Sequence, residues 1–311
     1  MDYRRLPLEG LNNARDIGGY PIAGGGVTAF RKFIRCEAPR KLSASDIEFL
    51  KSYGVTLSID FRGDGEISRH PSCLENIQGI EYRRCVTFDK QVAFASGSGG
   101  GEKAEKGAGE NTGSSAGESA GKSSAKKAES NAGENAEKST GEKAEKGAGE
   151  NAEKGAGEKR PAMDAFVDWG EKYIEIADNS RDWIRDTLMT MAHADGAVLF
   201  NCATGKDRTG IISALLLGLA GVAECDILAD YCVSELYLKE QYEELLAGFL
   251  EHWPDEKADI NSPFFKTAPV NMETFLAHVN KTHNGVESFI KTCGVDSSGV
   301  AALREKLIAV S

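Results

Sequence analysis

The sequence lacks the features that mark secreted, membrane-spanning and disulfide-stapled proteins. Its seven cysteines are an odd number, scattered without a Cys-x-x-Cys pair, which argues against a disulfide framework or a structural zinc site. The first ten residues carry charge but no apolar signal-peptide core. The longest apolar run, residues 211–223, is too short and glycine-interrupted to cross a bilayer. We therefore expect a cytoplasmic protein without a transmembrane segment.

Basic charge and histidine motifs are also scarce. Asp and Glu number 48 against 37 Lys and Arg, which gives a formal charge of −11. The five histidines form no recognisable metal-ligand motif. We predict no metal, no cofactor and no nucleic-acid partner, and the sequence does not indicate an oligomeric state.

One long internal segment lacks hydrophobic side chains larger than alanine. Residues 96–160 contain no Val, Ile, Leu, Met, Phe, Tyr, Trp or Cys, and residues 101–111 recur letter for letter at 141–151. Such a segment cannot bury enough apolar surface to offset the entropy lost on ordering. We predict a single domain, residues 1–311, interrupted by a mostly disordered insertion at 96–160, with transient helix as the alternative.

The chemistry that is present centres on residues 197–217. An apolar run, 197–200, precedes the polar stretch Asn201-Cys202-Ala203-Thr204-Gly205-Lys206-Asp207-Arg208-Thr209-Gly210, and a second apolar run follows it. This order predicts a strand, a tight turn and a helix. Backbone N–H groups of such a loop can turn inward at the helix N-terminus and bind an anion. The planar fork of Arg208 can bind two phosphate oxygens, and a thiolate at Cys202 is stabilised in the same place.

The Cys-x5-Arg spacing resembles that of cysteine-dependent phosphatases. The loop sequence is similar to that of the bacterial tyrosine phosphatase family, whose members act on phosphotyrosine and in some cases on phosphoinositides. Residues 12–20 resemble the Asn-Phe-Arg-Asp-Leu-Gly-Gly signature of that family, with Ala14 in place of the aromatic residue. Asp60-Phe61-Arg62 with Glu66 resembles its Asp-Leu-Arg…Glu motif, and Asp230-Tyr231…Ser234 matches the stretch after the loop.

The resemblance covers the chain outside the insertion and implies an α/β fold. We expect a central, mainly parallel twisted sheet flanked by helices, with extra C-terminal helices. It also implies a protein-tyrosine phosphatase that hydrolyses phosphomonoesters through a phosphocysteine. The expected substrate is a phosphotyrosyl protein. The alternatives are a phosphoinositide or dual-specificity phosphatase, and a phosphate-binding module without turnover.

The resemblance implies a role for each loop residue. Cys202 is the expected nucleophile and Arg208 the phosphate clamp. Asp207 is the expected general acid, although two neighbouring cations favour its ionised form until a phosphate is bound. Asp89, after a predicted strand, is the second candidate. The remaining expected residues are Ala203, Thr204, Gly205, Lys206 and Thr209 for substrate binding, and Asp60 and Arg62 for support. We also expect Thr209 to hydrogen-bond the Cys202 sulfur, and Lys206 to direct its charge toward a second anionic group.

Other interpretations of these motifs are weaker. Gly205-Lys206 is followed by Asp207, so the nucleotide-binding P-loop pattern fails. Trp253-Pro254-Asp255 looks like the acid loop of larger tyrosine phosphatases, but it follows the cysteine, and a helix-terminating turn explains it better. Asn201 stands where many cysteine phosphatases have His, and we expect it to act as a hydrogen-bond donor. Arg15 and Asp16 could alternatively form a structural ion pair with each other.

Local patterns predict the elements around the loop. Residues 43–46 form a capping box for a helix that runs to Tyr53 and stops at Gly54. The expected strands are 55–60 and 80–87, with two short extended segments in 27–35. The expected helices are 163–177, 181–194, a run through 250, 272–282, 286–293 and 300–309.

Overall fold

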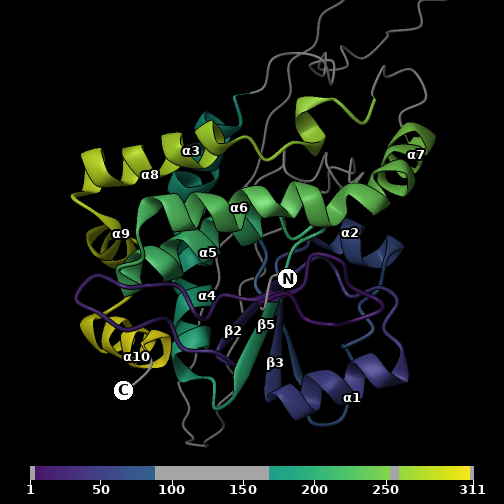
Figure 1. The fold of residues 1–311 in the computed structure, drawn as a ribbon, viewed down its shortest axis with the longest axis horizontal. Helices are drawn as coiled ribbons and strands as arrows, with labels where there is room; N and C mark the ends of the chain where they lie inside the picture. Colours follow the sequence, from purple (N-terminus) through teal and green to yellow (C-terminus); the bar gives the residue numbers. More distant parts are fainter. Residues whose placement is uncertain (1–3, 88–167, 253–258, 309–311) are drawn as a thin grey trace, which may run out of the picture. The chain divides into compact units, whose positions relative to one another are not determined.

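A five-stranded sheet lies at the centre of the fold, seen in a computed structural model that describes residues 4–87, 168–252 and 259–308 (Figure 1). The strands run in the order β1-β2-β5-β3-β4, and only the β1–β2 pair is antiparallel. Their bounds are β1 (Arg15–Asp16), β2 (Phe33–Cys36), β3 (Val55–Asp60), β4 (Glu81–Arg84) and β5 (Ala197–Asn201). The expected α/β fold with a mainly parallel sheet is confirmed. Parallel pairing brings the carboxyl ends of β2, β5, β3 and β4 to one edge.

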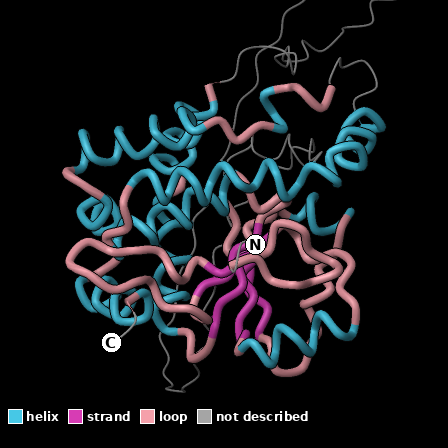
Figure 2. Tube along the Cα trace, viewed as in Figure 1, coloured by secondary structure: helices cyan, strands magenta, loops and turns pink. Residues whose placement is uncertain are grey.

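Helices surround the sheet, and Figure 2 shows the strands enclosed between helical and loop segments. The helices on the described residues are α1 (Ala44–Tyr53), α2 (Asp64–Arg69), α3 (Trp169–Asn179), α4 (Arg181–His193), α5 (Asp207–Ala220), α6 (Glu224–Leu238), α7 (Tyr242–His252), α8 (Pro269–His283), α9 (Val286–Thr292) and α10 (Ser297–Leu307). Short 3-10 turns, η2 (Lys239–Gln241) and η3 (Pro263–Phe265), join some of them. The three expected C-terminal helices are confirmed as α8, α9 and α10.

The two faces of the sheet bury different cores because alternate strand residues point to opposite sides. Phe33, Val198 and Phe200 pack into the larger core, which is shared with helices α3 to α6 and α8 to α10. Ile34 and Leu199 point the other way, into a smaller core with α1 and the N-terminal segment. The inner part of the sheet is therefore buried on both faces, and its central strand β5 is buried along its whole length, whereas the edge strand β4 is largely exposed.

Local capping signals set the ends of α1 as expected. The Ser43 hydroxyl accepts the Asp46 N–H at 3.1 Å, and the Asp46 carboxylate accepts the Ser43 N–H at 3.1 Å, which completes the capping box. Gly54 ends the helix with φ of 100°. The expectation for 27–35 was less accurate, because only Phe33–Cys36 pairs as a strand and residues 27 and 28 make isolated bridges.

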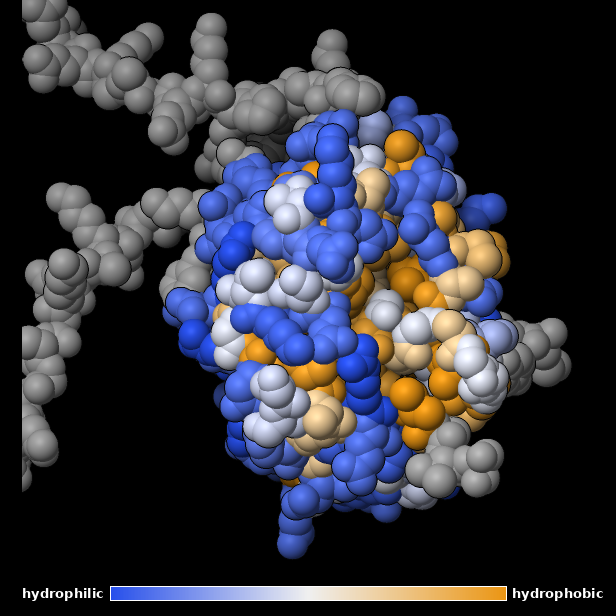
Figure 3. Space-filling model, turned by 90° about the vertical axis from the view of Figure 1, so that its left-hand side faces the viewer, coloured by the Kyte–Doolittle hydropathy of each residue, from blue (hydrophilic) through white to orange (hydrophobic). Residues whose placement is uncertain are grey.

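Several expectations fall outside the described residues. They are the insertion at 96–160, Asp89, the start of the helix expected from 163, and Trp253-Pro254-Asp255. The single-domain organisation therefore stays a prediction. Among the helices that the structure describes, none combines the length and apolar character needed to span a bilayer. The face shown in Figure 3 is largely hydrophilic, with hydrophobic residues gathered on one side.

Candidate active site

The Cys202 loop joins the end of the central strand β5 to the first residue of α5. Cys202 is only 2% exposed at the carboxyl edge of the sheet. Gly205 has φ of 68°, and a Cβ at this position would lie 2.3 Å from the Cys36 carbonyl oxygen. The loop therefore packs directly on the backbone after β2, which only glycine permits at this point.

Hydrogen bonds from the N-terminal segment hold the loop carbonyls. The Ala38 N–H donates to the Ala203 carbonyl at 3.1 Å. The Asn13 side-chain amide donates to the carbonyls of Thr204 and Gly205, at 3.0 and 3.3 Å. The first half of the loop is thus anchored through its carbonyl oxygens.

Arg35 continues this pattern around the loop. Its Nη2 donates to the Gly205 carbonyl at 2.7 Å and to the Lys206 carbonyl at 3.4 Å. Across a planar trans peptide the N–H of the next residue points opposite to the carbonyl. With the carbonyls of 203–206 turned to the protein, the N–H groups of 204–207 face the other side. Amides in this arrangement at the N-terminus of α5 fit the expected anion cradle, and anion binding by the loop stays a prediction.

A buried charge cluster supports the loop from behind. Asp230 of α6 accepts Arg15 Nε at 2.9 Å and Arg35 Nη1 at 2.5 Å, and all three side chains are 1% exposed. Arg15 also donates to the Ser234 hydroxyl at 2.9 Å. Burial opposes the Asp230 charge, but the two guanidinium groups hold the pKa of this carboxyl well below its usual range. The cluster links α6 and β1 to β2, the strand whose Arg35 binds the loop carbonyls.

The alternative pairing of Arg15 with Asp16 is wrong. Arg15 is paired with Asp230, whereas the Asp16 carboxylate accepts the Arg31 N–H at 2.7 Å and the Tyr53 hydroxyl at 2.8 Å. Adjacent residues in β1 point to opposite faces of the sheet, so their side chains cannot meet.

Arg208 is held by Glu66 and keeps one edge without a protein partner. Its Nη1 and Nη2 donate to the two Glu66 oxygens at 2.9 and 2.8 Å, and Nη1 also donates to the Phe61 carbonyl at 3.1 Å. Burial opposes the charge, but Glu66 and the nearby Cys202 raise the pKa of the Arg208 guanidinium. Its buried Nε has no hydrogen-bond partner among the described residues. The Nε–H and the second Nη2–H are parallel donors, the pair that a phosphate accepts.

Asp60 and Arg62 brace the neighbouring strand end. The Asp60 carboxylate accepts Arg62 Nε and Nη2 at 2.9 and 2.7 Å, together with the Tyr82 hydroxyl at 3.0 Å. Arg62 Nη1 donates to the His70 carbonyl at 2.7 Å, so the pair also holds the residue that ends α2. These contacts fit the supporting role expected for both residues, because α2 carries the Glu66 that holds Arg208.

Asp207 lies at the start of α5 and is 6% exposed. One carboxylate oxygen accepts the Tyr173 hydroxyl at 2.5 Å and lies 3.7 Å from Lys206 Nζ. Tyr173 is in turn 2.7 Å from the Tyr231 hydroxyl, which accepts the Asn271 amide at 3.3 Å. Burial and Asp207 raise the pKa of Tyr173 well above its usual value, so it stays a donor. The second Asp207 oxygen makes no hydrogen bond in the described part of the chain.

The Lys206 amine is turned into the protein. Its Nζ donates to the Phe264 carbonyl and lies 5.3 and 5.2 Å from the ring centres of Trp169 and Phe264. The side chain is 5% exposed. In this conformation Lys206 does not present its charge to solvent, and its expected contact with a second anionic group stays a prediction.

The side chains of Asn201 and Thr209, at the two ends of the loop, differ in their hydrogen bonding. Asn201 Nδ2 donates to the Cys202 carbonyl at 3.3 Å, which confirms that this side chain acts as a donor. The buried Thr209 hydroxyl has no partner among the described residues, so the expected hydrogen bond to the Cys202 sulfur is absent from this structure. The expected contact with the sulfur therefore stays a prediction.

Comparison with known proteins agrees with this geometry. A family model described as "Tyrosine phosphatase family" matches residues 6–309. The chain belongs to the tyrosine phosphatase family. Similar proteins include a tyrosine-protein phosphatase of Nostoc commune, 31% identical over 159 residues. That match covers 47% of this chain and 51% of that protein. A provisionally named tyrosine-protein phosphatase of Cupriavidus necator is 27% identical over 230 residues, which cover 74% of this chain and 62% of that protein. The chain thus matches only about half to three-fifths of the length of these relatives.

Three residues that hold the site in this member of the tyrosine phosphatase family were missed by the sequence reasoning. Asn13 and Arg35 bind the loop carbonyls, and Tyr173 binds Asp207. Arg35 is the penultimate residue of a strand, at the edge where ligands bind in parallel sheets, and that position was the available signal. Tyr173 looked like a core aromatic residue, and nothing in the local sequence distinguishes the two roles.

One group of described side chains outside the loop has the geometry of a metal site. The ligand atoms of Asp178, His278 and His283 all lie within 4.8 Å of one another. In the structure the His278 ring nitrogen lies 3.1 Å from the Asp178 carboxylate, and Arg181 pairs with the same carboxylate at 3.0 Å. The group thus joins α3 to α8 through the contact between Asp178 and His278. The sequence did not reveal it because its members lie 100 residues apart.

Proposed function

We propose that this tyrosine phosphatase family member hydrolyses phosphotyrosyl proteins in two steps through a phosphocysteine. The observation that carries the proposal is the buried Nε–H of Arg208 close to Cys202, which has no partner in the part of the chain that the structure describes. It lies beside a loop whose amides face away from its anchored carbonyls. The phosphate dianion supplies acceptors for these donors. The relatives' names support the same activity.

In the first step Cys202 sulfur forms a bond to phosphorus while the bond from phosphorus to the tyrosine oxygen breaks. Charge on the three equatorial oxygens is met by the amides of 204–207 and by the free edge of Arg208. Glu66 keeps this guanidinium in place without occupying that edge. The donors are therefore positioned before the substrate arrives, so little reorganisation is needed in the transition state.

Asp207 is the proposed proton donor to the departing tyrosine oxygen. Tyr173 fixes one of its oxygens, which leaves the second to carry the proton. In the second step the carboxylate takes a proton from the water that attacks phosphorus, and the Cys202 thiolate leaves. Asp89, the other candidate acid, lies outside the described residues.

The test is hydrolysis of p-nitrophenyl phosphate and of phosphotyrosyl peptides by the purified full chain. We expect vanadate-sensitive turnover that falls by about 10⁴-fold or more in Cys202→Ser, because the activated nucleophile is lost. Thermal unfolding should confirm that the variant is folded. Phosphate or vanadate binding without Cys202-dependent hydrolysis would instead identify a phosphate-binding module. Faster hydrolysis of inositol phosphates than of the peptides would favour the phosphoinositide alternative.

A further inference from the structure

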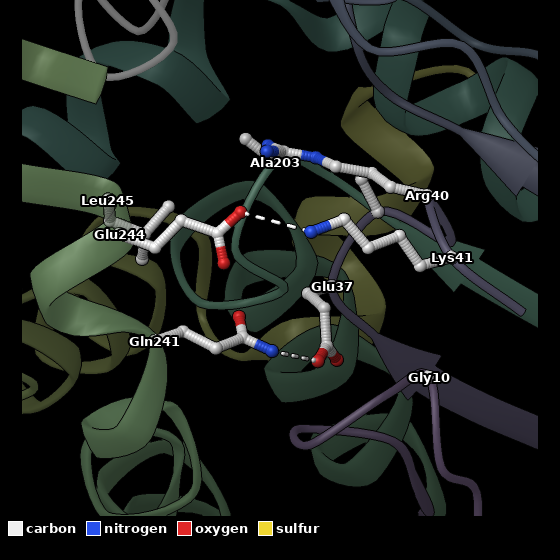
Figure 4. A pocket seen from close by; sticks show the side chains of 9 residues that line it. Gly10, Glu37, Arg40, Lys41, Ala203, Gln241, Glu244 and Leu245 are labelled. Carbon is white, nitrogen blue, oxygen red and sulfur yellow. Dashed lines mark hydrogen bonds and ion pairs between the residues drawn. The ribbon is translucent and has the colours of Figure 1, made fainter. Parts of the chain in front are cut away.

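A pocket of about 70 Å³ opens beside the Cys202 loop. Its lining includes Ala203 of the loop, Glu37, Arg40 and Lys41 from the segment after β2, and Gln241 and Glu244 from the helical segment that includes η2 and α7. Figure 4 shows these side chains converging on the pocket. No residue of this pocket other than Ala203 has a role in the proposed reaction. The pocket is therefore placed to contact a part of the substrate next to the phosphate.

Three of the charged groups in the pocket already have partners. The Lys41 amine pairs with the Glu244 carboxylate at 3.3 Å. The buried Glu37 carboxylate accepts the Asn12 N–H at 2.6 Å and the Gln241 side-chain amide at 3.2 Å. In Figure 4 dashes join the first pair and the Gln241–Glu37 pair. The two carboxylates outnumber the one amine, so these three groups add no net attraction for an anion.

Arg40 is different. It makes no hydrogen bond or ion pair with any residue in the described ranges, and Figure 4 draws its guanidinium without an interaction to the other lining side chains. The side chain is partly buried. Burial and the charge of Arg62 lower the pKa of the Arg40 guanidinium, and the charges of Glu244, Glu66 and Glu37 oppose this only in part. A partly desolvated cation without a partner gains more from a hydrogen-bonded anion than an exposed one does.

The backbone fixes Arg40 relative to the loop. Two residues before it, the Ala38 N–H donates to the Ala203 carbonyl at 3.1 Å, and the Pro39 carbonyl accepts the Cys73 N–H at 2.8 Å. Arg40 therefore starts from a backbone that is bonded directly to the loop. The backbone from which its side chain extends is therefore held in place relative to the loop.

We infer that Arg40 forms a second anion subsite, which binds the carboxylate of an acidic residue adjacent to the phosphotyrosine in a protein substrate. The inference rests on the proposed function. Among the described residues that line the pocket, Arg40 is the one cation without a partner, and the Lys206 amine of the loop itself is turned to the Phe264 carbonyl. One carboxylate matches this single charge. An inositol lipid with several phosphates in an anionic bilayer would instead meet the exposed Glu244, whose side chain is 72% exposed.

The test compares kcat/KM for matched phosphotyrosyl peptides with Asp, Ala or Lys at the positions next to phosphotyrosine. We expect the wild-type chain to prefer the best acidic peptide over its Ala counterpart by about tenfold, the value of one partly exposed charge-assisted hydrogen bond. Arg40→Gln should bring that ratio close to one, and Arg40→Lys should retain part of the preference because the charge is kept. The ratio is the readout, so a general loss of folded protein cannot imitate the effect.

Lys51→Gln is the matched control, since Lys51 is a surface residue of α1 that pairs with Glu48 at 3.1 Å, and the variant changes net charge equally. It should keep the wild-type ratio. Equal rates for all peptides in the wild type, or a preference that survives in Arg40→Gln, would overturn the subsite. So would a loss confined to short-chain phosphoinositides. Failure of the proposed function is distinct, because the wild type would then hydrolyse neither the peptides nor p-nitrophenyl phosphate.

Discussion

The two sides of the Cys202 loop differ in how their polar groups find partners. Behind the loop, Asn13 and Arg35 bind its carbonyls, and Asp230 neutralises Arg35 and Arg15. In front, the Nε of Arg208 and the hydroxyl of Thr209 are buried without partners in the described part of the chain. One side of the same short loop is bonded to the protein, and the other is left for a ligand.

This difference separates the groups that stabilise the fold from the groups that could bind a ligand. Unpartnered buried donors cost free energy, so a fold tolerates them where a ligand repays the cost. The paired side compensates by anchoring the loop through charge-assisted hydrogen bonds. We therefore expect substitutions behind the loop to change mainly the free energy of unfolding, and substitutions in front to change mainly turnover.

Asp230→Asn should have the largest effect and tests the back of the loop. The change leaves two buried guanidinium groups without a carboxylate, which we expect to lower the free energy of unfolding by about 3–5 kcal/mol. Urea denaturation followed by circular dichroism measures the change. Glu224→Gln, an exposed position on the same helix, is the control and should change stability by less than about 0.5 kcal/mol.

The pH dependence of this loss has a defined sign. Because the pKa of Asp230 is lower in the folded state than in the unfolded state, its stabilisation is complete above about pH 4 and is lost as the pH falls further. The difference between wild type and Asp230→Asn should therefore shrink below pH 4. A difference that grew on acidification would show that the pairing with Arg15 and Arg35 does not stabilise the fold.

Arg208→Lys tests the front of the loop and should have the next largest effect. Lysine keeps a charge near Glu66 but cannot offer two parallel N–H donors to phosphate. We expect kcat to fall by about 10²–10³-fold, the cost of losing transition-state hydrogen bonds to the oxygens. Steady-state kinetics together with the urea midpoint measure both properties.

Arg62→Lys is the matched comparison, because Arg62 is also buried and bidentate to a carboxylate but pairs with Asp60. It should lose more stability and less turnover than Arg208→Lys. The reverse order would contradict the division between the two sides of the loop.

The sequence was sufficient for the elements whose signals are local. The Ser43 capping box and Gly54 gave the bounds of α1, and the apolar run before Cys202 gave β5. The mainly parallel sheet was inferred through the family resemblance, as a fold class. The order of its strands was not predicted. The segment 27–35 was harder, because its pairing depends on partners such as Ile308, far away in the chain.

The site itself divides in the same way. The loop residues are consecutive, so spacing identified Cys202 and Arg208. The groups that orient them come from distant segments: Asn13 contacts a loop residue 191 positions later, and Arg35 contacts Gly205 across 170 positions. No local pattern encodes such a contact. Lys206 shows the converse, since its charge suggested a substrate contact but tertiary packing directs its amine to the Phe264 carbonyl.

Asp207→Asn should have the smallest of the three effects. It tests the same difference between bonded and unbonded groups on the two oxygens of one carboxylate. One Asp207 oxygen is bound to Tyr173, as at the back of the loop, and the other has no partner in the described residues, as at the front. If the second oxygen carries the proton, kcat for a phosphotyrosyl peptide should fall by about 10²-fold. The loss should be smaller for p-nitrophenyl phosphate, because nitrophenolate leaves without needing a proton. An equal loss for both substrates would mean that Asp207 serves only to hold the loop, and Asp89→Asn would then be the variant to measure.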